Sequence, residues 1–169
     1  SLRRTKTDKA DSSTIASYLM STEYKPNSGL LYHNYTLKSL CRARESLIKE
    51  RSKIAVLLTN ELDKSFPEIK PFFNNIISST LLYILNKYKN ASHIALMKDY
   101  ESLRKVSHGK FSYAKFTKLK ELAKNSVGYH DDNTDLLIST YISVYNHLTS
   151  KIDPIDKQIS TIIKELNPR

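Results

Sequence analysis

Helix-breaking residues are scarce in this chain, whose 169 residues include only three glycines and five prolines. Long intervals without either residue favour helices and leave few sites for tight turns. Apolar and polar residues rarely alternate with the period of two that marks a strand, and no segment predicts one. We therefore expect an all-α fold.

Cysteine and long apolar runs are also lacking. The single cysteine, Cys41, excludes a disulfide framework within the chain and fits a reducing compartment. No apolar run approaches the roughly 18 residues of a membrane span, and no secretory signal pattern opens the chain. These absences predict a cytoplasmic protein without a membrane partner.

The usual catalytic and metal-binding motifs are absent as well. The five histidines are scattered, and no Cys-x-x-Cys, His-Glu-x-x-His, P-loop or Gly-x-Ser-x-Gly pattern occurs. The eleven tyrosines invite comparison with tyrosine recombinases, but no cluster of arginine and histidine accompanies any of them. We therefore set that class aside.

Positive charge is what the chain has in excess. Lysine and arginine number 27 against 17 aspartates and glutamates, a formal net charge of +10. Such an excess indicates a polyanionic partner, most simply DNA or RNA. Two basic segments, residues 38–53 and 110–124, supply the candidate contacts: Arg42, Arg44, Lys49, Lys53, Lys110, Lys115 and Lys118.

Both basic segments also have a simpler interpretation. Arg42 and Lys49 lie seven residues apart and share a helix face that can follow a phosphate backbone. A solvated helix with internal pairs such as Glu45 with Lys49 explains the same pattern. In the second segment, Phe111 and Phe116 are better explained as core residues than as platforms for stacked bases.

A first long helix is predicted over residues 35–65, which contain no glycine or proline. Its apolar residues follow a three-four spacing, interrupted by Arg44 and Arg51 at core-type positions. Pro67 ends the helix, because the residue before a proline is driven out of helical geometry. The apolar positions are Leu37, Leu40, Leu47, Ile54 and Leu58.

A second long helix begins near Asp131 or Asp132 and carries an apolar stripe at heptad spacing, with a kink or short break expected at Pro154. We expect the two long helices to form an antiparallel, coiled-coil-like hairpin. Shorter helices over residues 79–88, 92–97 and 113–126 would form a small insert at one end. The first half of the stripe comprises Leu137, Tyr141, Val144 and Leu148.

The start of the chain combines two carboxylates with an amphipathic helix predicted over residues 8–20. Asp8 and Asp11 lie three residues apart on one face, so they can reach the same point. Two converging carboxylates form half of a Mg²⁺ site of the kind that runs phosphodiester chemistry. Acidic residues in a first helical turn also complement the helix dipole, and the spacing leaves both interpretations open.

Residues 6–19 resemble the end of the nuclease domain of the insertion-sequence transposases of the one-ten family, or DEDD transposases. Asp8 and Asp11 match the last two of that family's four acidic residues, within a Lys-x-Asp-x-x-Asp stretch. Further stretches resemble the family in its own order: its long basic helix, the exit of that helix, and an Ala-x-x-Ser-x-Gly motif, at residues 37–51, 60–68 and 123–128.

The resemblance implies a parent enzyme that recombines DNA, with Mg²⁺ at the acidic site and a structured non-coding RNA as guide. In this family a RuvC-like nuclease domain is joined through a coiled coil to a C-terminal transposase domain. No counterpart of the first Asp and Glu precedes Asp8. The resemblance therefore implies a middle fragment, inactive alone and without tightly bound metal.

This comparison predicts four parts: a nuclease-domain remnant (1–33), a first long helix (34–66), a helical insert (67–130) and a second long helix (131–169). The favoured function is that of a transposase fragment whose long helices hold nucleic acid and join protomers into a homodimer or higher oligomer. The alternative is a non-enzymatic, basic helical adaptor that dimerises and binds nucleic acid. In the adaptor, Asp8 and Asp11 only cap a helix.

Overall fold

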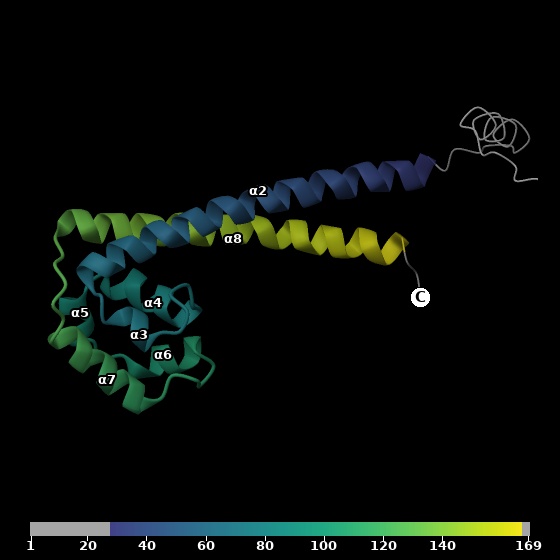
Figure 1. The fold of residues 1–169 in the computed structure, drawn as a ribbon. Coiled ribbons are helices and arrows are strands. Elements are labelled where there is room, and N and C mark those ends of the chain that lie inside the picture. The colour runs from purple at the N-terminus through teal and green to yellow at the C-terminus, as the bar shows by residue number, and fades with distance from the viewer. Residues whose placement is uncertain (1–27, 167–169) are drawn as a thin grey trace, which may run out of the picture. The chain divides into compact units, whose positions relative to one another are not determined.

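The computed structural model describes residues 28–166, which form helices and loops (Figure 1). No strand occurs in this range, and the all-α prediction is confirmed. The chain divides into two compact units, residues 1–38 and 39–169. The helix predicted over residues 8–20 lies outside the described range. The helices are α2 (Ser28–Ser65), α3 (Ile69–Phe72), α4 (Ser79–Tyr88), α5 (Ala91–Ala95), α6 (Tyr100–Val106), α7 (Tyr113–Lys124) and α8 (Asp132–Leu166).

The predicted ends of the long helices are largely correct. α2 ends at Ser65, two residues before Pro67, and α8 begins at Asp132 with Asp131 as its cap, accepting the Thr134 N–H at 2.8 Å. α8 runs through Pro154 as one helix. The start of α2 was predicted at residue 35, but the helix begins at Ser28. The prediction was too late because the stretch up to Gly29 was expected to be a loop. One glycine costs a helix only about 1 kcal/mol and does not end it.

Side chains join α2 to α8 within the second unit. Arg44 forms an ion pair with Asp156, while Arg51 donates to the Thr149 hydroxyl at 3.3 Å and lies 5.6 Å from the centre of the Tyr145 ring. The two arginines at core-type positions thus bind the facing helix. Arg44, the earlier arginine on α2, contacts the later residue on α8, and Arg51 contacts the earlier one. Coiled-coil packing of the pair stays a prediction.

The buried face of α8 differs from the predicted stripe over the first half of the helix. Ile138 and Ile142 are buried, whereas Leu137 and Val144 remain 38% and 37% exposed. α8 carries apolar residues on two adjacent faces, and α4 packs against this helix. Ile138 and Ile142 belong to the core shared with α4. Heptad spacing alone could not show which face the insert would cover.

The insert between the long helices was predicted to have a small core of its own, but its buried residues form one core with the end of α2 and the first half of α8. α4 has the predicted bounds, and α7 buries Phe116, Leu119 and Ala123 on the expected face. α5 packs on α7, and α4 packs on α5 and α6. Prediction missed α3 and α6, which have four and seven residues and offer too little periodicity to detect. The described residues include no helix long and apolar enough to cross a membrane.

Glu68, just after α2, ties that helix to the segment that leads into α8. Its carboxylate accepts the Ser126 hydroxyl at 2.7 Å and the Val127 N–H at 3.0 Å. A backbone hydrogen bond joins the same two segments: the Tyr129 N–H donates to the Lys64 carbonyl oxygen at 2.9 Å. We call these contacts the Glu68 clamp, because they close the insert where its two ends meet.

Gly128 lies so close to the end of α2 that no side chain fits there. An ideal Cβ at this position would be 2.2 Å from the Ser65 carbonyl oxygen and 2.8 Å from the Phe66 nitrogen. Its N–H donates to the Ser126 hydroxyl at 3.2 Å. The Ser-x-Gly pattern therefore has a structural reason in this chain: serine bonds to Glu68, and glycine allows the close approach.

Replacing Gly128 with alanine should unfold or severely weaken the protein, because the new methyl group would overlap backbone that cannot move aside. We expect a loss of at least ~3 kcal/mol in the free energy of unfolding, measured by urea denaturation. Gly109→Ala is the matched control: it meets open space but has φ of +78°, so it should cost only about 1 kcal/mol. Equal losses in the two variants would contradict the steric explanation.

The Glu68 clamp should also make stability depend on pH. Burial raises the pKa of the Glu68 carboxyl, but the hydrogen bonds from Val127 and Ser126 outweigh it and hold the pKa below its ordinary value. A lowered folded-state pKa adds stability above the unfolded-state pKa of about 4.3, and this stability is lost as pH falls through the folded value.

Glu68→Gln should therefore lower the free energy of unfolding at pH 7 by about 1 kcal/mol and flatten its decline below about pH 4.5. Glu165→Gln, at an exposed position near the end of α8, is the control and should change neither quantity. Denaturation curves across acid pH provide the measurement. Parallel curves for Glu68→Gln and the unaltered protein would mean that the carboxylate charge adds nothing.

Candidate nucleic-acid interface

The predicted Mg²⁺ ligands Asp8 and Asp11 lie outside the described residues. Within residues 28–166, no three His, Cys, Asp or Glu side chains gather so that they could hold a metal ion. The metal site remains a prediction that depends on the two aspartates.

The lysines of α2 pair within their own helix. Lys49 lies 2.7 Å from the Glu45 carboxylate, and Lys53 lies 2.8 Å from that of Glu50. The hydrogen bond from Lys49 lowers the pKa of Glu45, and its charge acts in the same direction. These are the pairs expected of a solvated helix surface. Arg42 is exposed and makes no ion pair with any residue from 28 to 166.

Arg44 points toward α8 rather than along the outer face of α2. Its guanidinium bonds to the Asp156 carboxylate, and first this hydrogen bond and then the carboxylate charge raise the pKa of Arg44. The bond holds a side chain that was predicted to contact nucleic acid. Its position serves the contact between the two long helices.

The second basic segment has a different arrangement. Lys110 lies in the loop before α7, and Lys115 and Lys118 lie on that helix; all three are exposed and form no ion pair within the described part of the chain. A hollow of about 500 Å³ between α3 and α7 is lined by Lys115, Lys118 and Phe72, together with Glu68. Lys115 also lines a second hollow, together with Lys110.

Further basic residues that the sequence analysis missed lie beside this segment. Arg104 and Lys105 are in the last turn of α6, and they line another hollow with His108 and with Glu101, whose carboxylate lies 4.0 Å from the Arg104 guanidinium. The chain then turns through His108 and Gly109, whose φ angles are +51° and +78°. The sequence did contain a signal for these residues, because basic side chains followed by a glycine are typical of the end of a helix.

His108 lines both the hollow beside α6 and the hollow of Lys110, and Lys115 lines the next one along. Each hollow thus shares one basic residue with the next, and these residues come from two helices and the loop between them. We call this surface the α6–α7 basic groove; it comprises Arg104, Lys105, His108, Lys110, Lys115 and Lys118.

The phenylalanines beside the groove belong to the core, as predicted. Phe111 and Phe116 are both buried. The Phe111 ring stacks on that of Phe73 with 6.0 Å between centroids and 7° between planes. Tyr113, by contrast, is largely exposed and packs edge-on against Tyr100 with centroids 5.2 Å apart. The groove thus has a rigid aromatic support.

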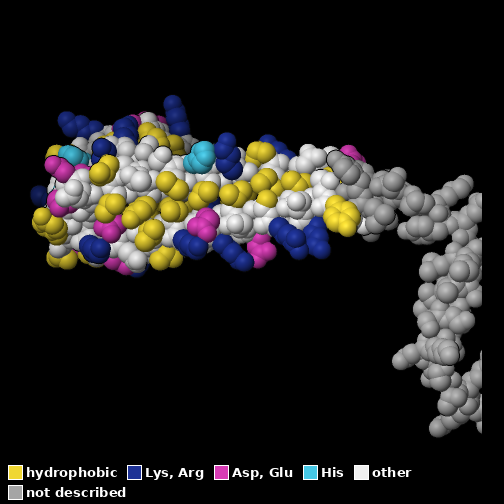
Figure 2. Space-filling model, turned by 90° about the horizontal axis from the view of Figure 1, so that it is seen from above, with side chains coloured by type: hydrophobic (Ala, Val, Ile, Leu, Met, Phe, Trp, Pro, Cys, Tyr) yellow, Lys and Arg dark blue, Asp and Glu magenta, His cyan; other side chains and the backbone are white. Residues whose placement is uncertain are grey.

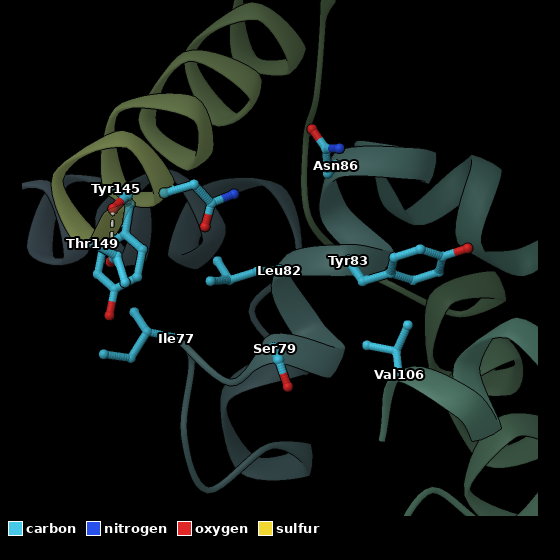
Figure 3. Close-up of a pocket in the computed structure, with 9 residues that line it drawn as sticks. Ile77, Ser79, Leu82, Tyr83, Asn86, Val106, Tyr145 and Thr149 are labelled. Atoms are coloured by element: carbon cyan, nitrogen blue, oxygen red, sulfur yellow. Dashed lines mark hydrogen bonds between the residues drawn. The ribbon is translucent and has the colours of Figure 1, made fainter. Parts of the chain in front are cut away.

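A fourth hollow, of about 480 Å³, lies between α4 and α8 (Figure 3). Leu82 projects into it from α4, facing Tyr145 and Thr149 of α8, and the Thr149 hydroxyl donates to the Tyr145 carbonyl oxygen at 2.9 Å. No carboxylate, lysine or histidine lines it. Its polar side chains are neutral hydroxyl, phenol and amide groups, and it adjoins the hollow of Lys110 through Ser79.

Comparison with known proteins gives one family. No curated protein matches the chain significantly. The family model of the DEDD transposases of IS110 insertion sequences, described as a transposase, matches residues 1–67. The matched range includes Asp8, Asp11 and the whole of α2, and it ends at Pro67, before the α6–α7 basic groove. Residues 1–67 of the chain are thus similar to the DEDD transposases of the IS110 family.

Proposed function

We propose that this chain is part of a DNA transposase in which Asp8 and Asp11 supply two of four acidic metal ligands. The family match over residues 1–67 is the observation that carries the proposal, and no comparison favours a non-enzymatic adaptor. Mg²⁺ held at such a site would polarise a phosphodiester and activate the attacking oxygen. Two carboxylates alone leave Mg²⁺ mostly water-bound, so the 169-residue chain should be inactive without the remaining ligands.

In this proposal, residues 1–33 complete the nuclease domain and residues 34–169 form the part that holds nucleic acid and joins protomers. DNA and a structured RNA are the partners, in the cytoplasm. The net charge of +10 supports a nucleic-acid partner. Within the second unit, the α6–α7 basic groove is the better candidate surface, because its lysines lack the internal pairs that occupy Lys49 and Lys53.

The charge-reversed variant with Lys115→Glu and Lys118→Glu should bind DNA and RNA of every sequence more weakly. Each lost phosphate contact reduces the slope of log affinity against log salt by about 0.7 to 0.9, so the slope should fall by up to about 2. Fluorescence anisotropy with labelled oligonucleotides over a salt series measures both quantities. Reversal of Arg42 and Lys49 together should have a smaller effect, because Lys49 already pairs with Glu45.

Reversal of Lys151 and Lys164 on α8 is the control, because it changes net charge equally away from the groove. If this control weakens binding as much as the groove variant does, net charge alone explains the affinity. If none of the three variants changes the affinity for nucleic acid, the described helices do not form the nucleic-acid interface.

We further propose that α8 joins two copies of the chain. Leu137 and Val144, with half-buried Tyr141 and Leu148, repeat at heptad spacing on a face that the insert leaves exposed. Hydrophobic side chains form a line along the face drawn in Figure 2. A heptad stripe of this kind fits a second copy of the same helix, which would bury it by coiled-coil packing.

Leu137→Asp together with Val144→Asp should therefore shift the chain toward monomer, because each would place a carboxylate in an apolar contact. Ser143→Asp adds a charge at an exposed neighbouring position and serves as the control. Light scattering over a range of protein concentrations gives the mass. A chain that is monomeric before any substitution would refute this interface.

A further inference from the structure

We propose that the hollow between α3 and α7 is a binding pocket for an unpaired guanine base of a single-stranded nucleic acid. This inference rests on the proposed function, and it adds a base-binding position to the α6–α7 basic groove, to which Lys115 and Lys118 belong. The hollow has a volume of about 500 Å³, which is in the usual range for pockets that hold small molecules. It lies beyond residues 1–67, the range that the family model matches.

The apolar lining of the hollow suits a flat ring. Pro71 and Phe72 come from α3, Leu122 comes from α7, and all three side chains stay at least partly exposed. The Phe72 ring is supported from behind by edge contacts, with centroids 5.1 Å from Phe73 and 6.4 Å from Phe111. An aromatic ring held in this way can stack on a base of any nucleic acid strand.

Glu68 brings a hydrogen-bond acceptor into the same hollow. Its two oxygens accept the Ser126 hydroxyl at 2.7 Å and the Val127 N–H at 3.0 Å. A carboxylate has about four acceptor positions, so each oxygen can accept one more hydrogen bond. Burial raises the pKa of Glu68, but the hydrogen bonds from Val127 and Ser126 hold it below its ordinary value. The group is therefore ionised at neutral pH, and a ligand beside it must offer donors.

The lysines of the hollow are available for phosphate. Lys115 and Lys118 are exposed, lie three residues apart on one face of α7, and form no ion pair within residues 28–166, not even with Glu68. The hollow thus combines an apolar lining with an acceptor and two cations. Its ligand should carry an apolar ring, hydrogen-bond donors and negative charge in separate places.

A nucleotide meets these requirements better than an acidic peptide does. A peptide could place acidic groups at the lysines and an apolar side chain in the hollow, but Glu68 would then lose water without gaining a donor, which is unfavourable. A nucleotide has its N–H donors on the base and its negative charge on the phosphate. Guanine offers adjacent donors, N1–H and the 2-amino group, on the pairing edge that is free in a single strand.

The test is fluorescence anisotropy of the 169-residue chain with a labelled single-stranded oligothymidine that carries a single central guanine, compared with the same strand without guanine. We expect the strand with guanine to bind about fivefold or more tighter. Inosine lacks the 2-amino group and should lose most of this gain. 7-deazaguanine lacks only the N7 acceptor that a lysine would read, and it should keep the gain.

Two variants test the residues of the pocket. Glu68→Gln should abolish the preference for guanine, because the amide loses acceptor capacity and adds a donor. Its affinity for the strand without guanine should not fall, which also shows that the variant is folded. Glu165→Gln makes the same charge change at an exposed position of α8 and should keep the preference. Phe72→Leu should weaken binding of the guanine strand about fivefold or more, whereas Tyr113→Leu, an exposed ring outside the hollow, should not.

The outcomes separate this inference from the proposed function. Oligonucleotide binding without a preference for guanine, or with a preference that Glu68→Gln leaves intact, would overturn the pocket and leave the nucleic-acid proposal standing. A gain that disappears with 7-deazaguanine would assign the contact to a lysine and would also overturn the pocket. Guanosine monophosphate, measured by calorimetry, is the second probe. If it binds in a manner that depends on Glu68 while no oligonucleotide binds, the pocket is supported with a free nucleotide as its ligand, against the nucleic-acid proposal.

Discussion

The hydrogen bonds that Glu68 accepts from Ser126 and Val127 fix the two ends of the insert against each other. They join the end of α2 to the segment that precedes α8, so the intervening helices start and finish at one point. Gly128 makes this possible, because any larger residue would collide with the Ser65 carbonyl group. Closed in this way, the insert can form one core with the end of α2 and the first half of α8.

That shared core explains which parts of the fold the sequence could predict. Helix ends followed from Pro67 and Asp131, whose effects are local and were read correctly. The burial of Ile138 in place of Leu137 was not predictable, because both faces of α8 are apolar and only the position of α4 decides between them. Asp8 and Asp11 were identified by likeness to a family, and their geometry lies outside the described residues.

The candidate nucleic-acid surface illustrates the same distinction between local and tertiary information. Lysine counts singled out α2 and α7 equally, but the spacing on α2 places a carboxylate beside each of Lys49 and Lys53. The contribution of Arg104 and Lys105 required the turn at His108 and Gly109, which brings the end of α6 to the basic loop. A linear pattern cannot show that three hollows adjoin.

The two long helices use their arginines differently from their lysines, and this bears on the proposed nucleic-acid interface. Arg44 and Arg51 bond to Asp156 and Thr149, so they hold α2 against α8 and are not free to meet phosphate. Lys49 and Lys53 each lie beside a carboxylate that a phosphate would have to displace, so α2 is the weaker of the two candidate surfaces. In the proposed function, nucleic acid on α2 would engage these lysines and Arg42 and would leave the contacts that join the helices intact. The helix pair can then act as a support whose geometry does not depend on whether nucleic acid is bound.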